Sequence, residues 1–459
     1  MIKYNDYLKI DKELDSYKLT YKNFELSKLL RDELIYQLNK KEKESTPKVT
    51  ITKRALKRLI ISMFKSIPIL FIKKKIWVFS NADRRKIFNS KYIDRVGSIV
   101  SEVYPNDTLF IENHIINDIK KPSSDIILSE SFLQALSLFM IFIFYNHKKI
   151  KLVGDISVLE KKYDIEIKLN GLIKKHIGQY YSMKLFLLLK KPPKVIFIVY
   201  PNGYYGYMDF FKKKKIPIIE LQHGIIHLNH HSYNYNNIPN VNEFKPNYIF
   251  TYGSKDKTIL EEMLFLPHNK IFSIGSYMIS LQEKTIVSSY LLEILKSNTE
   301  QRKVIIISAS IPDLNEMLNW ASKISVINSN LLLLILPRTN IKTNFIDTTN
   351  FKILDPNLTN IYELIKCCDV HVTKNSTTCL EALFLNKKSI IYESIERTSI
   401  YRTNYDYINQ LSYFTSYEEF LELINSELNN EDNNINLLFE ENNVSKFKNS
   451  MRKINLGNV

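Results

Sequence analysis

Short apolar runs alternate with longer amphipathic stretches along most of this chain. Before residue 280, runs rich in β-branched and aromatic residues lie at 76–80, 108–111, 195–199, 216–221, 248–251 and 271–274. Runs of this length predict buried strands, and the stretches between them predict helices, for example around 93–103. Strands that alternate with helices pair in parallel through crossovers. This half therefore predicts a doubly wound α/β domain.

The pattern starts again after a polar, helical connector that follows Gly275. Further apolar runs lie at 304–308, 331–336, 351–354, 370–373 and 389–392. We therefore expect two doubly wound, Rossmann-like domains, at 71–280 and 281–425, that face each other across a cleft. Such clefts are preferred ligand sites. A helical, basic extension is expected at 1–70 and a helical tail at 426–459.

Composition narrows the classes of protein. A chain of 459 residues is long for one core, which agrees with two domains. Neither half carries Gly-x-Gly-x-x-Gly after its first strand, and no Gly-x-x-x-x-Gly-Lys-Ser/Thr motif occurs. These absences argue against a dinucleotide dehydrogenase and a P-loop phosphotransferase. The three cysteines, Cys367, Cys368 and Cys379, are too few and too clustered for a disulfide framework, which indicates a reducing compartment.

The formal net charge of +16 has three possible explanations: nucleic acid, an anionic membrane surface, or simple lysine bias. No nucleic-acid module is recognisable, so no nucleic-acid partner is expected, and an anionic leaflet fits better. The apolar stretch 132–145, interrupted by Gln134 and Ser137, is too short to span a bilayer. It predicts a buried or membrane-leaning helix. Residues 1–10 carry charges throughout and lack the apolar region of a signal peptide, so we expect a cytoplasmic protein, peripheral at the inner face of the membrane.

The strand at 216–221 ends at Gln222-His223-Gly224. In open α/β sheets ligands bind at the carboxyl ends of strands, so His223 is a candidate general base. Imidazole suits that role because its pKa lies near neutral pH. A plain hydrogen-bonded loop histidine is the alternative. A zinc site is a further one, because His227, His230 and His231 lie close together, although no cysteine or helical His-x-x-x-His spacing supports it.

A second constellation follows the strand at 370–373. Ser376 or Thr377 is expected as the N-cap of a helix, whose free N–H groups and dipole could bind phosphate. Glu381, one turn into the helix, could accept from ribose hydroxyls. The alternative is an ordinary capped helix in which Glu381 pairs with a cap at Thr378.

Two other strand ends of the second half point toward the same edge. Ser308 and Ser310 follow the strand at 304–308, and Arg338 follows the strand at 331–336. A guanidinium can hold phosphate oxygens bidentately. For Arg338 a surface ion pair is the competing interpretation.

Together, the segments 218–225, 248–253, 273–276 and the helix start at 376–382 resemble the GT-B class of nucleotide-sugar glycosyltransferases, specifically bacterial enzymes that build capsule or O-antigen polysaccharide. The resemblance covers roughly residues 75–425. The segment 81–86, with Tyr92-Ile93-Asp94-Arg95, resembles the first-strand region of such enzymes. The sequence departs from them at Leu336-Pro337-Arg338, where related sialyl- and polyol-phosphate transferases often carry His-Pro.

The resemblance implies an acceptor domain followed by a donor domain, with a nucleotide-sugar as co-substrate and neither metal nor other cofactor. It implies His223 as general base, with Asp83 in reserve. Donor phosphate and nucleotide would be bound by Ser308, Ser310, Arg338, Ser376, Thr377, Thr378 and Glu381. The acceptor side would hold Arg84, Arg85, Gln222, Gly224 and Tyr233.

The expected function is transfer of a sugar from a nucleotide-sugar to a growing lipid-linked capsule or O-antigen polysaccharide at the cytoplasmic membrane face. A CDP-alditol polyol-phosphate transferase of the teichoic-acid type is the first alternative. A sugar-nucleotide epimerase would act without an acceptor glycan. A non-catalytic membrane-surface assembly protein would bind lipid without nucleotide.

Overall fold

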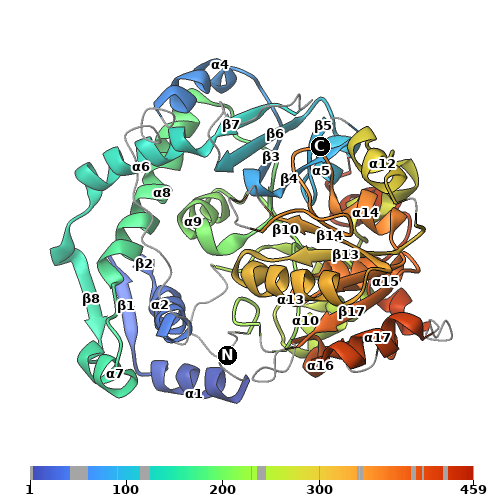
Figure 1. Ribbon diagram of the computed structural model, residues 1–459. Helices are drawn as coiled ribbons and strands as arrows, with labels where there is room; N and C mark the ends of the chain where they lie inside the picture. Colours follow the sequence, from blue (N-terminus) through green and yellow to red (C-terminus); the bar gives the residue numbers. More distant parts are fainter. Residues whose placement is uncertain are drawn as a thin grey trace.

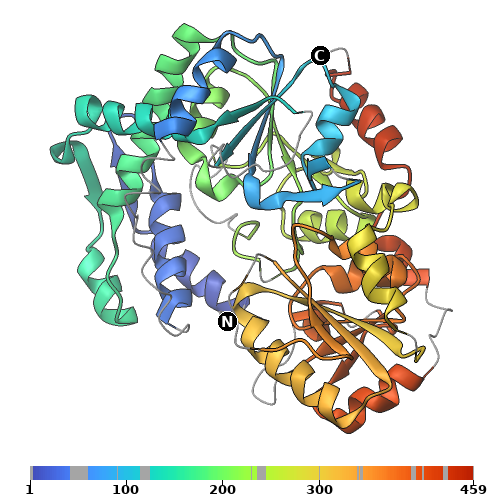
Figure 2. The same cartoon turned by 45° about the horizontal axis from the view of Figure 1, so that its top comes forward.

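The computed structural model describes residues 4–41, 60–89, 91–113, 125–228, 230–234, 244–298, 300–338, 341, 345–393, 400–405, 408–426 and 433–457. Within this part, two parallel sheets, each with apolar cores on both faces, form two α/β domains (Figures 1 and 2). The prediction of two Rossmann-like domains is confirmed. The boundaries at 70, 280 and 425 stay predictions.

The first domain is built on a seven-stranded parallel sheet with the order β12-β11-β10-β9-β3-β6-β7. Alternate residues of its strands serve opposite faces: Trp77 and Phe79 belong to one core and Ile76 and Val78 to the other. Its strands are β3 (Ile76–Asn81), β6 (Thr108–Asn113), β7 (Ile127–Ser129), β9 (Val195–Ile198), β10 (Ile218–Leu221), β11 (Tyr248–Thr251) and β12 (Ile271–Ser273).

The second domain has a six-stranded parallel sheet with the order β15-β14-β13-β16-β17-β18. Its central strands are buried on both faces, which explains their nearly unbroken apolar sequence. The strands are β13 (Lys303–Ala309), β14 (Leu331–Pro337), β15 (Phe351–Ile353), β16 (Val370–Thr373), β17 (Lys388–Tyr392) and β18 (Ser412–Phe414).

Helices connect these strands and cover the sheets. Those before the connector are α4 (Ile67–Leu70), α5 (Ser98–Val103), α6 (Glu130–Phe144), α7 (Ile156–Tyr163), α8 (Leu169–Leu189), α9 (Tyr205–Lys213), α10 (Ser254–Glu262) and α11 (Tyr277–Ser280). Those after it are α12 (Ser289–Lys296), α13 (Leu314–Ile327), α14 (Ile361–Cys367), α15 (Thr378–Phe384), α16 (Ile400–Asn404), α17 (Tyr417–Asn425) and α18 (Asn443–Lys453). Among the described helices, none is long and apolar enough to cross a membrane.

The structure differs from the sequence prediction just after the first strand. A short 3-10 helix (Ala82–Arg84) leads into an antiparallel hairpin of β4 (Arg85–Phe88) and β5 (Lys91–Asp94), where a turn and the start of a helix were expected. Helix α5 begins only at Ser98, because the Asp94 carboxylate accepts from the N–H groups of Val96 and Gly97 at 2.8 and 2.7 Å and holds the chain in a turn.

The N-terminal extension also contains strands that were not expected. Besides α1 (Tyr4–Leu14) and α2 (Ser27–Lys41), it forms β1 (Lys18–Tyr21) and β2 (Phe24–Glu25), and β1 pairs with the distant β8 (Ile150–Val153). Pairing across more than 100 residues is a tertiary effect that local sequence does not show. Residues 42–59 of the extension lie outside the described part.

A buried ion pair ties the extension to the first domain. The Arg31 guanidinium is fully buried, donates to Asp11 at 2.6 Å, and also donates to the carbonyls of His231 and Asn234 in the loop that follows β10. Removing one partner of such a pair costs about 3–5 kcal/mol. The extension is therefore an integral part of the first domain's surface near His223.

The C-terminal segment returns to the first domain. Phe447 and Met451 of α18 are packed in the core beneath the seven-stranded sheet. The returning chain passes tightly over Gly253 and Gly275: a Cβ at these positions would lie 2.2 Å from the Leu437 carbonyl oxygen and 2.1 Å from the Glu440 carbonyl oxygen. Gly275 also has a φ of +88°, which other residues rarely adopt. The chain thus crosses between the domains twice.

Candidate active site at the facing strand ends

Each sheet has one place where its strand order reverses, and the candidate residues lie at this place or one strand away from it. In the first sheet the reversal falls between β9 and β3, and in the second between β13 and β16. Loops diverge at such points and leave a crevice at the carboxyl ends of the strands. His223 follows β10 and Arg84 follows β3, while Ser308 ends β13. The two crevices belong to opposite walls of the space between the domains.

The β4–β5 hairpin brings the two walls together. Lys86 donates to the Arg338 carbonyl at 3.3 Å, and the Asn360 amide donates to the Ile87 carbonyl at 2.9 Å. Just beyond the hairpin, Arg95 forms an ion pair with Glu381 at 3.0 Å. The strand ends of the first domain therefore face helix α15 and the end of β14.

His223 is held against Tyr200, with ring centroids 5.3 Å apart and the planes nearly perpendicular. Its Nδ1 is buried and has no hydrogen-bond partner among the described residues. Burial, reinforced by the positive charges of Arg84 and Arg95, lowers the pKa of His223 to about 3. The imidazole is therefore unprotonated at neutral pH, and the same low pKa makes it a weak base as long as the arginine charges are not offset.

Arg84 and Arg95 lie close enough to this imidazole to act on it electrostatically, and Arg338 of the second domain lies close enough to act on Arg84. Burial lowers the pKa of Arg84, and the like charges of Arg95 and Arg338 lower it further. Arg338 is exposed, and no described residue pairs with its side chain. Guanidinium groups gathered without enough carboxylates form a site for an anion with several oxygens.

Glu381 forms contacts within the protein, where hydrogen bonds to ribose hydroxyls were expected. Its Oε1 accepts from Arg95, and its Oε2 accepts from the Tyr362 hydroxyl at 2.9 Å. It is 1% exposed. In this arrangement of the domains Glu381 joins the two walls, so contact with a ribose requires the pair with Arg95 to open.

The predicted hydroxyls of the second domain mostly bond to one another. Ser308 lies 2.9 Å from Nε2 of His371 and 2.7 Å from the Thr378 hydroxyl. Thr378 in turn donates to the Ser376 hydroxyl at 2.8 Å. Ser310 donates to Asp313 and is drawn away from this cluster. Thr377 is the N-cap residue of α15, as expected, but its side chain makes no capping hydrogen bond. Ser310, Ser376 and Thr377 are partly exposed, whereas Ser308 and Thr378 are buried.

Several of the residues predicted for the acceptor side form ion pairs or hydrogen bonds with other residues of the protein. Arg85 is buried in ion pairs with Glu112 at 2.7 Å and Asp125 at 2.8 Å, which anchor the hairpin to the sheet. Gln222 bridges the Asp256 carboxylate and the Tyr252 N–H, and fixes the loop. The Tyr233 hydroxyl donates to Glu220 at 2.8 Å and is buried.

Gly224 and Asp83 complete the predicted set. The Gly224 carbonyl accepts from the Gln222 side chain at 2.9 Å, and a Cβ on Gly224 would meet no atom within 4 Å. Gly224 is therefore not required by crowding. Asp83 lies in the 3-10 helix after β3, and its side chain lies outside the described part of the structure.

Two residues that were not predicted as site residues belong to this region. Arg95 joins the domains and lowers the pKa of His223. Glu220 is fully buried in β10, and burial raises its pKa to about 8. Its Oε2 has no described partner, and it lines one small cavity with His223 and His230. A carboxylate inside an otherwise apolar strand was the available signal, since such a group is seldom buried without a role.

The neighbouring histidines pack as rings and do not form a metal cluster. His230 stacks with His231 at 5.5 Å, and burial lowers the pKa values of His227 and His231 to about 4. No group of three or more possible metal ligands is found among the described residues.

A pocket beside Arg84 opens at the carboxyl ends of β3, β6 and β9. It is lined by Asn81, Asn113 and Glu130 from the first domain's strand ends and by Lys174 and Lys175 from α8. Polar side chains with hydrogen-bonding groups of both kinds suit a hydroxylated ligand.

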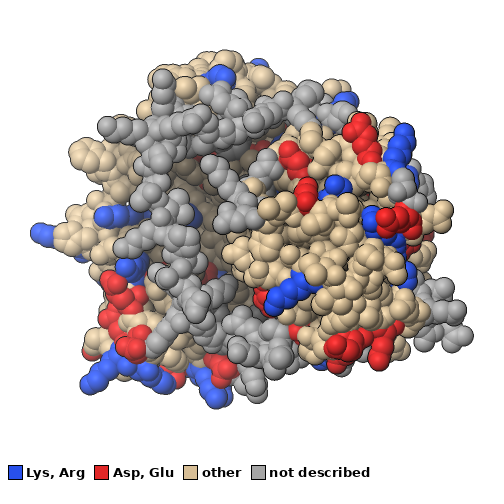
Figure 3. Space-filling model, in the orientation of Figure 1, with Lys and Arg blue, Asp and Glu red and all other residues tan. Residues whose placement is uncertain are grey.

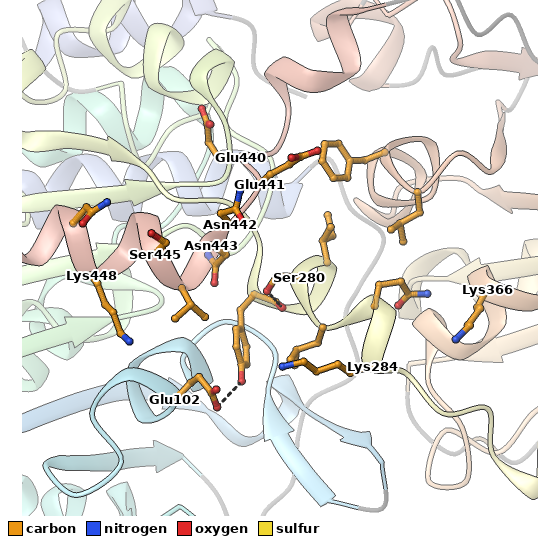
Figure 4. Close-up of a pocket in the computed structure, with 18 of the residues that line it drawn as sticks. Glu102, Ser280, Lys284, Lys366, Glu440, Glu441, Asn442, Asn443, Ser445 and Lys448 are labelled. Carbon is orange, nitrogen blue, oxygen red and sulfur yellow. Dashed lines mark hydrogen bonds between the residues drawn. The ribbon is translucent and has the colours of Figure 1, made fainter.

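A separate groove lies between the domains near the connector and the returning chain. Figure 4 shows Glu440, Glu441 and Lys448 along one wall and Lys284 and Lys366 along the other, with the Tyr277 hydroxyl bonded to Glu102 at 3.4 Å. Carboxylates and lysines are mixed here, and none of the predicted site residues lines this groove. The predicted site residues therefore lie outside this groove.

The comparisons with known proteins bear on the fold. No family model and no curated protein matches the sequence. Among solved structures, the chain is similar to S. aureus MnaA in complex with UDP, at 12% identity, a TM-score of 0.51, and 83% of this chain and 97% of that one. It also aligns with the UDP-GlcNAc 2-epimerase of Neisseria meningitidis bound to UDP-GlcNAc, at 12% identity and a TM-score of 0.46, over 83% of this chain and 97% of that one. A third alignment, with the wall teichoic acid polymerase TagF, has 13% identity and a TM-score of 0.45, and covers 93% of this chain and 95% of that one. The two facing α/β domains have the GT-B type of fold.

Proposed function

We propose that this protein is a nucleotide-sugar-dependent glycosyltransferase whose donor and acceptor meet between His223 and the strand ends of the second domain. The observation that carries the proposal is the convergence of a neutral, partly unpartnered imidazole with Arg84, Arg95 and Arg338 from both domains. A base for a hydroxyl and cations for a leaving phosphate are the two requirements of glycosyl transfer without a metal.

In the proposed reaction, His223 accepts the proton of the acceptor hydroxyl while its oxygen forms a bond to the anomeric carbon of the donor. The bond from that carbon to the nucleotide phosphate breaks, and the electron pair leaves with the phosphate. Arg338 and Arg84 stabilise its negative charge. Because the phosphates offset the positive field of the arginines, donor binding raises the pKa of His223 and makes it a stronger base.

The proposed acceptor is a lipid-linked capsule or O-antigen glycan at the cytoplasmic membrane face, held in the pocket beside Arg84. The polar lining of this pocket, with Asn81, Asn113 and the two lysines of α8, supports a hydroxylated acceptor. The bacterial surface-polysaccharide enzymes that the sequence resembles support the same assignment.

A thermal-shift screen against CMP, CDP, UDP, GDP and dTDP, with and without EDTA, tests the donor site. One nucleotide should stabilise the protein by about 2.7 kcal/mol at hundredfold excess over its Kd, without dependence on EDTA. Arg338→Ala should abolish most of this gain, whereas Arg452→Ala, in the other groove, should keep it.

The same screen separates the alternatives. Stabilisation by no nucleotide contradicts the proposal and favours a non-catalytic assembly protein. Stabilisation by CDP, followed by phosphate in the polymer product, identifies a polyol-phosphate transferase instead. Conversion of a nucleotide-sugar without any acceptor identifies an epimerase.

A further inference from the structure

We infer that helix α6 docks this protein on an anionic phospholipid bilayer. Four large apolar side chains form one stripe on its outer side: Leu138, Phe139, Phe142 and Ile143, which are 70, 55, 87 and 51% exposed. Positions spaced by one, four and five residues lie on one helix face. The opposite face packs toward α8. Helix α6 thus carries a second apolar face that the fold leaves uncovered.

A second exposed apolar element adjoins the start of α6. The Ser129 N–H, at the N-cap of α6, donates to the Ser66 hydroxyl just before α4 at 3.1 Å. Phe64 and Phe71, on either side of α4, are both exposed. Figures 1 and 2 show α4 and the beginning of α6 on the same side of the first domain. The uncovered apolar surface therefore extends beyond one helix.

Apart from Glu130, which is buried at the start of α6, the charged residues in the segments around this helix are lysines. Between Ser131 and Gly154 the sequence has Lys148, Lys149 and Lys151 and no aspartate or glutamate. Between Ile167 and Met208, which includes all of α8, lysines again occur without any acidic residue. In Figure 3 tan, uncharged surface projects at the upper left, on the side where Figure 1 shows α6, with blue atoms of Lys or Arg below it. Each lysine near an anionic leaflet strengthens binding about fivefold.

The lipid surface explains this pattern better than a second copy of the chain. In a symmetric dimer the same patch would face itself, and the flanking lysines of both copies would repel one another. An apolar stripe bordered by lysines is typical of helices that lie in the plane of the bilayer interface. At 15 residues, α6 is also too short to span. The aromatic ring of Tyr145 at its end, with the Lys174 ammonium 5.1 Å from the ring centroid, suits the headgroup region.

The docking surface shares α6 with the pocket beside Arg84. Gln134, Ser137 and Ile141 of α6 line that pocket, and so does Leu138 at the edge of the apolar stripe, while Phe139 and Phe142 lie outside it. A membrane-anchored acceptor can therefore extend its polar end from the leaflet toward Arg84 without leaving the lipid. This extension of the inference rests on the proposed function, whereas bilayer docking does not.

Vesicle flotation of the full-length protein, without nucleotide, tests the docking. Vesicles of phosphatidylglycerol mixed with phosphatidylcholine should bind the protein, and pure phosphatidylcholine should bind it much more weakly. The double variant Phe139→Ser/Phe142→Ser should bind at least about thirtyfold more weakly. Lys148→Glu/Lys149→Glu should lose more than about tenfold and respond less to salt. Val326→Ser, which changes an 85% exposed side chain on α13, is the matched control and should bind like the unaltered protein.

Two results would overturn the inference. One is that the unaltered protein and both α6-region variants float with the anionic vesicles to the same extent, or that none of them floats. The other is a dimer of the unaltered protein in solution that dissociates in Phe139→Ser/Phe142→Ser, without vesicle binding; this would assign the face to a second copy. A cooperative thermal unfolding transition at the temperature of the unaltered protein, measured without vesicles or nucleotide, confirms that each variant is folded and keeps the docking result separate from the donor site.

Discussion

Two histidines, one from each domain, show how differently the facing strand ends are built. Burial lowers the pKa of both His223 and His371 to about 3. His371 lies within β16, is fully buried, and has a hydroxyl within 2.9 Å of each ring nitrogen, from Ser308 and Ser389. His223 follows a strand and has a buried Nδ1 without a described partner. A depressed pKa alone therefore does not identify a catalytic histidine; unused hydrogen-bonding capacity distinguishes the two.

The largest expected effect is on activity. His223→Ala should lower kcat with the proposed donor and acceptor by about 10²–10⁴-fold, because the proton of the acceptor hydroxyl then has no positioned base. The nucleotide-induced thermal shift should remain, since the phosphate-binding arginines are unchanged. Steady-state kinetics beside thermal shifts checks both. Full activity in this variant would remove His223 from the mechanism.

His371→Ala should affect stability instead. It leaves Ser308, Thr378 and Ser389 short of a buried partner and creates a cavity, so the free energy of unfolding should fall by about 2–4 kcal/mol. Turnover per folded molecule should stay within a few fold. Denaturant unfolding monitored by fluorescence measures the loss. A stable variant without activity would contradict the structural role given to this histidine.

A smaller effect is expected on the pH dependence of kcat/KM. The base must be unprotonated, and its folded pKa lies below the ordinary value of 6.5, so activity is lost only as the pH falls well below neutrality. Arg84→Gln removes one of the charges that hold this pKa down. In Arg84→Gln the fall in kcat/KM on the acidic side should then occur at a higher pH, while Arg84→Lys, which keeps the charge, should leave the pH of this fall unchanged. An unchanged pH of the fall in Arg84→Gln would show that the protonation of another group causes it.

The smallest effect concerns the glycine of the Gln-His-Gly motif. Gly224→Ala should change stability by no more than about 0.5 kcal/mol, because its Cβ would meet no atom. Gly253→Ala is the matched contrast, since its Cβ would lie 2.2 Å from the Leu437 carbonyl oxygen and displace the returning chain. Equal melting temperatures for the two variants would contradict the tight crossing over Gly253.

The fold was predictable because parallel strands that are buried on both faces of a sheet consist of short, nearly continuous runs of apolar residues. Predicted and observed strands coincide at Tyr248–Thr251 and Val370–Thr373. The hairpin β4–β5 was missed because its two strands have only four residues each, half of them charged, and because Arg85 anchors it through ion pairs with the distant Glu112 and Asp125. The strands of the extension were missed because β1 finds its partner in β8.

From the sequence, the places of the candidate site residues at strand ends could be predicted better than the groups that they contact. Strand ends marked the locations of His223, Arg84 and Ser376, since strand order and loop position follow from the alternating pattern. The sequence does not show which side chains form ion pairs or hydrogen bonds with one another. Glu381 pairs with Arg95 of the other domain, and Ser308 with His371, because the packing of the two sheets and two domains brings these side chains together.

The double crossing of the chain limits how the two domains can move. One crossing is the connector after Gly275, and the other is the returning segment whose Glu440 N–H bonds to the Tyr252 carbonyl at 2.9 Å. Two covalent links prevent the domains from separating by translation and leave rotation about the line through both links as the easy motion. The Arg95–Glu381 ion pair lies beside these links, because Arg95 lines one small cavity with Gly275 and Asn443. The hairpin contacts of Lys86 with the Arg338 carbonyl and of Asn360 with the Ile87 carbonyl are then further restraints on the rotation.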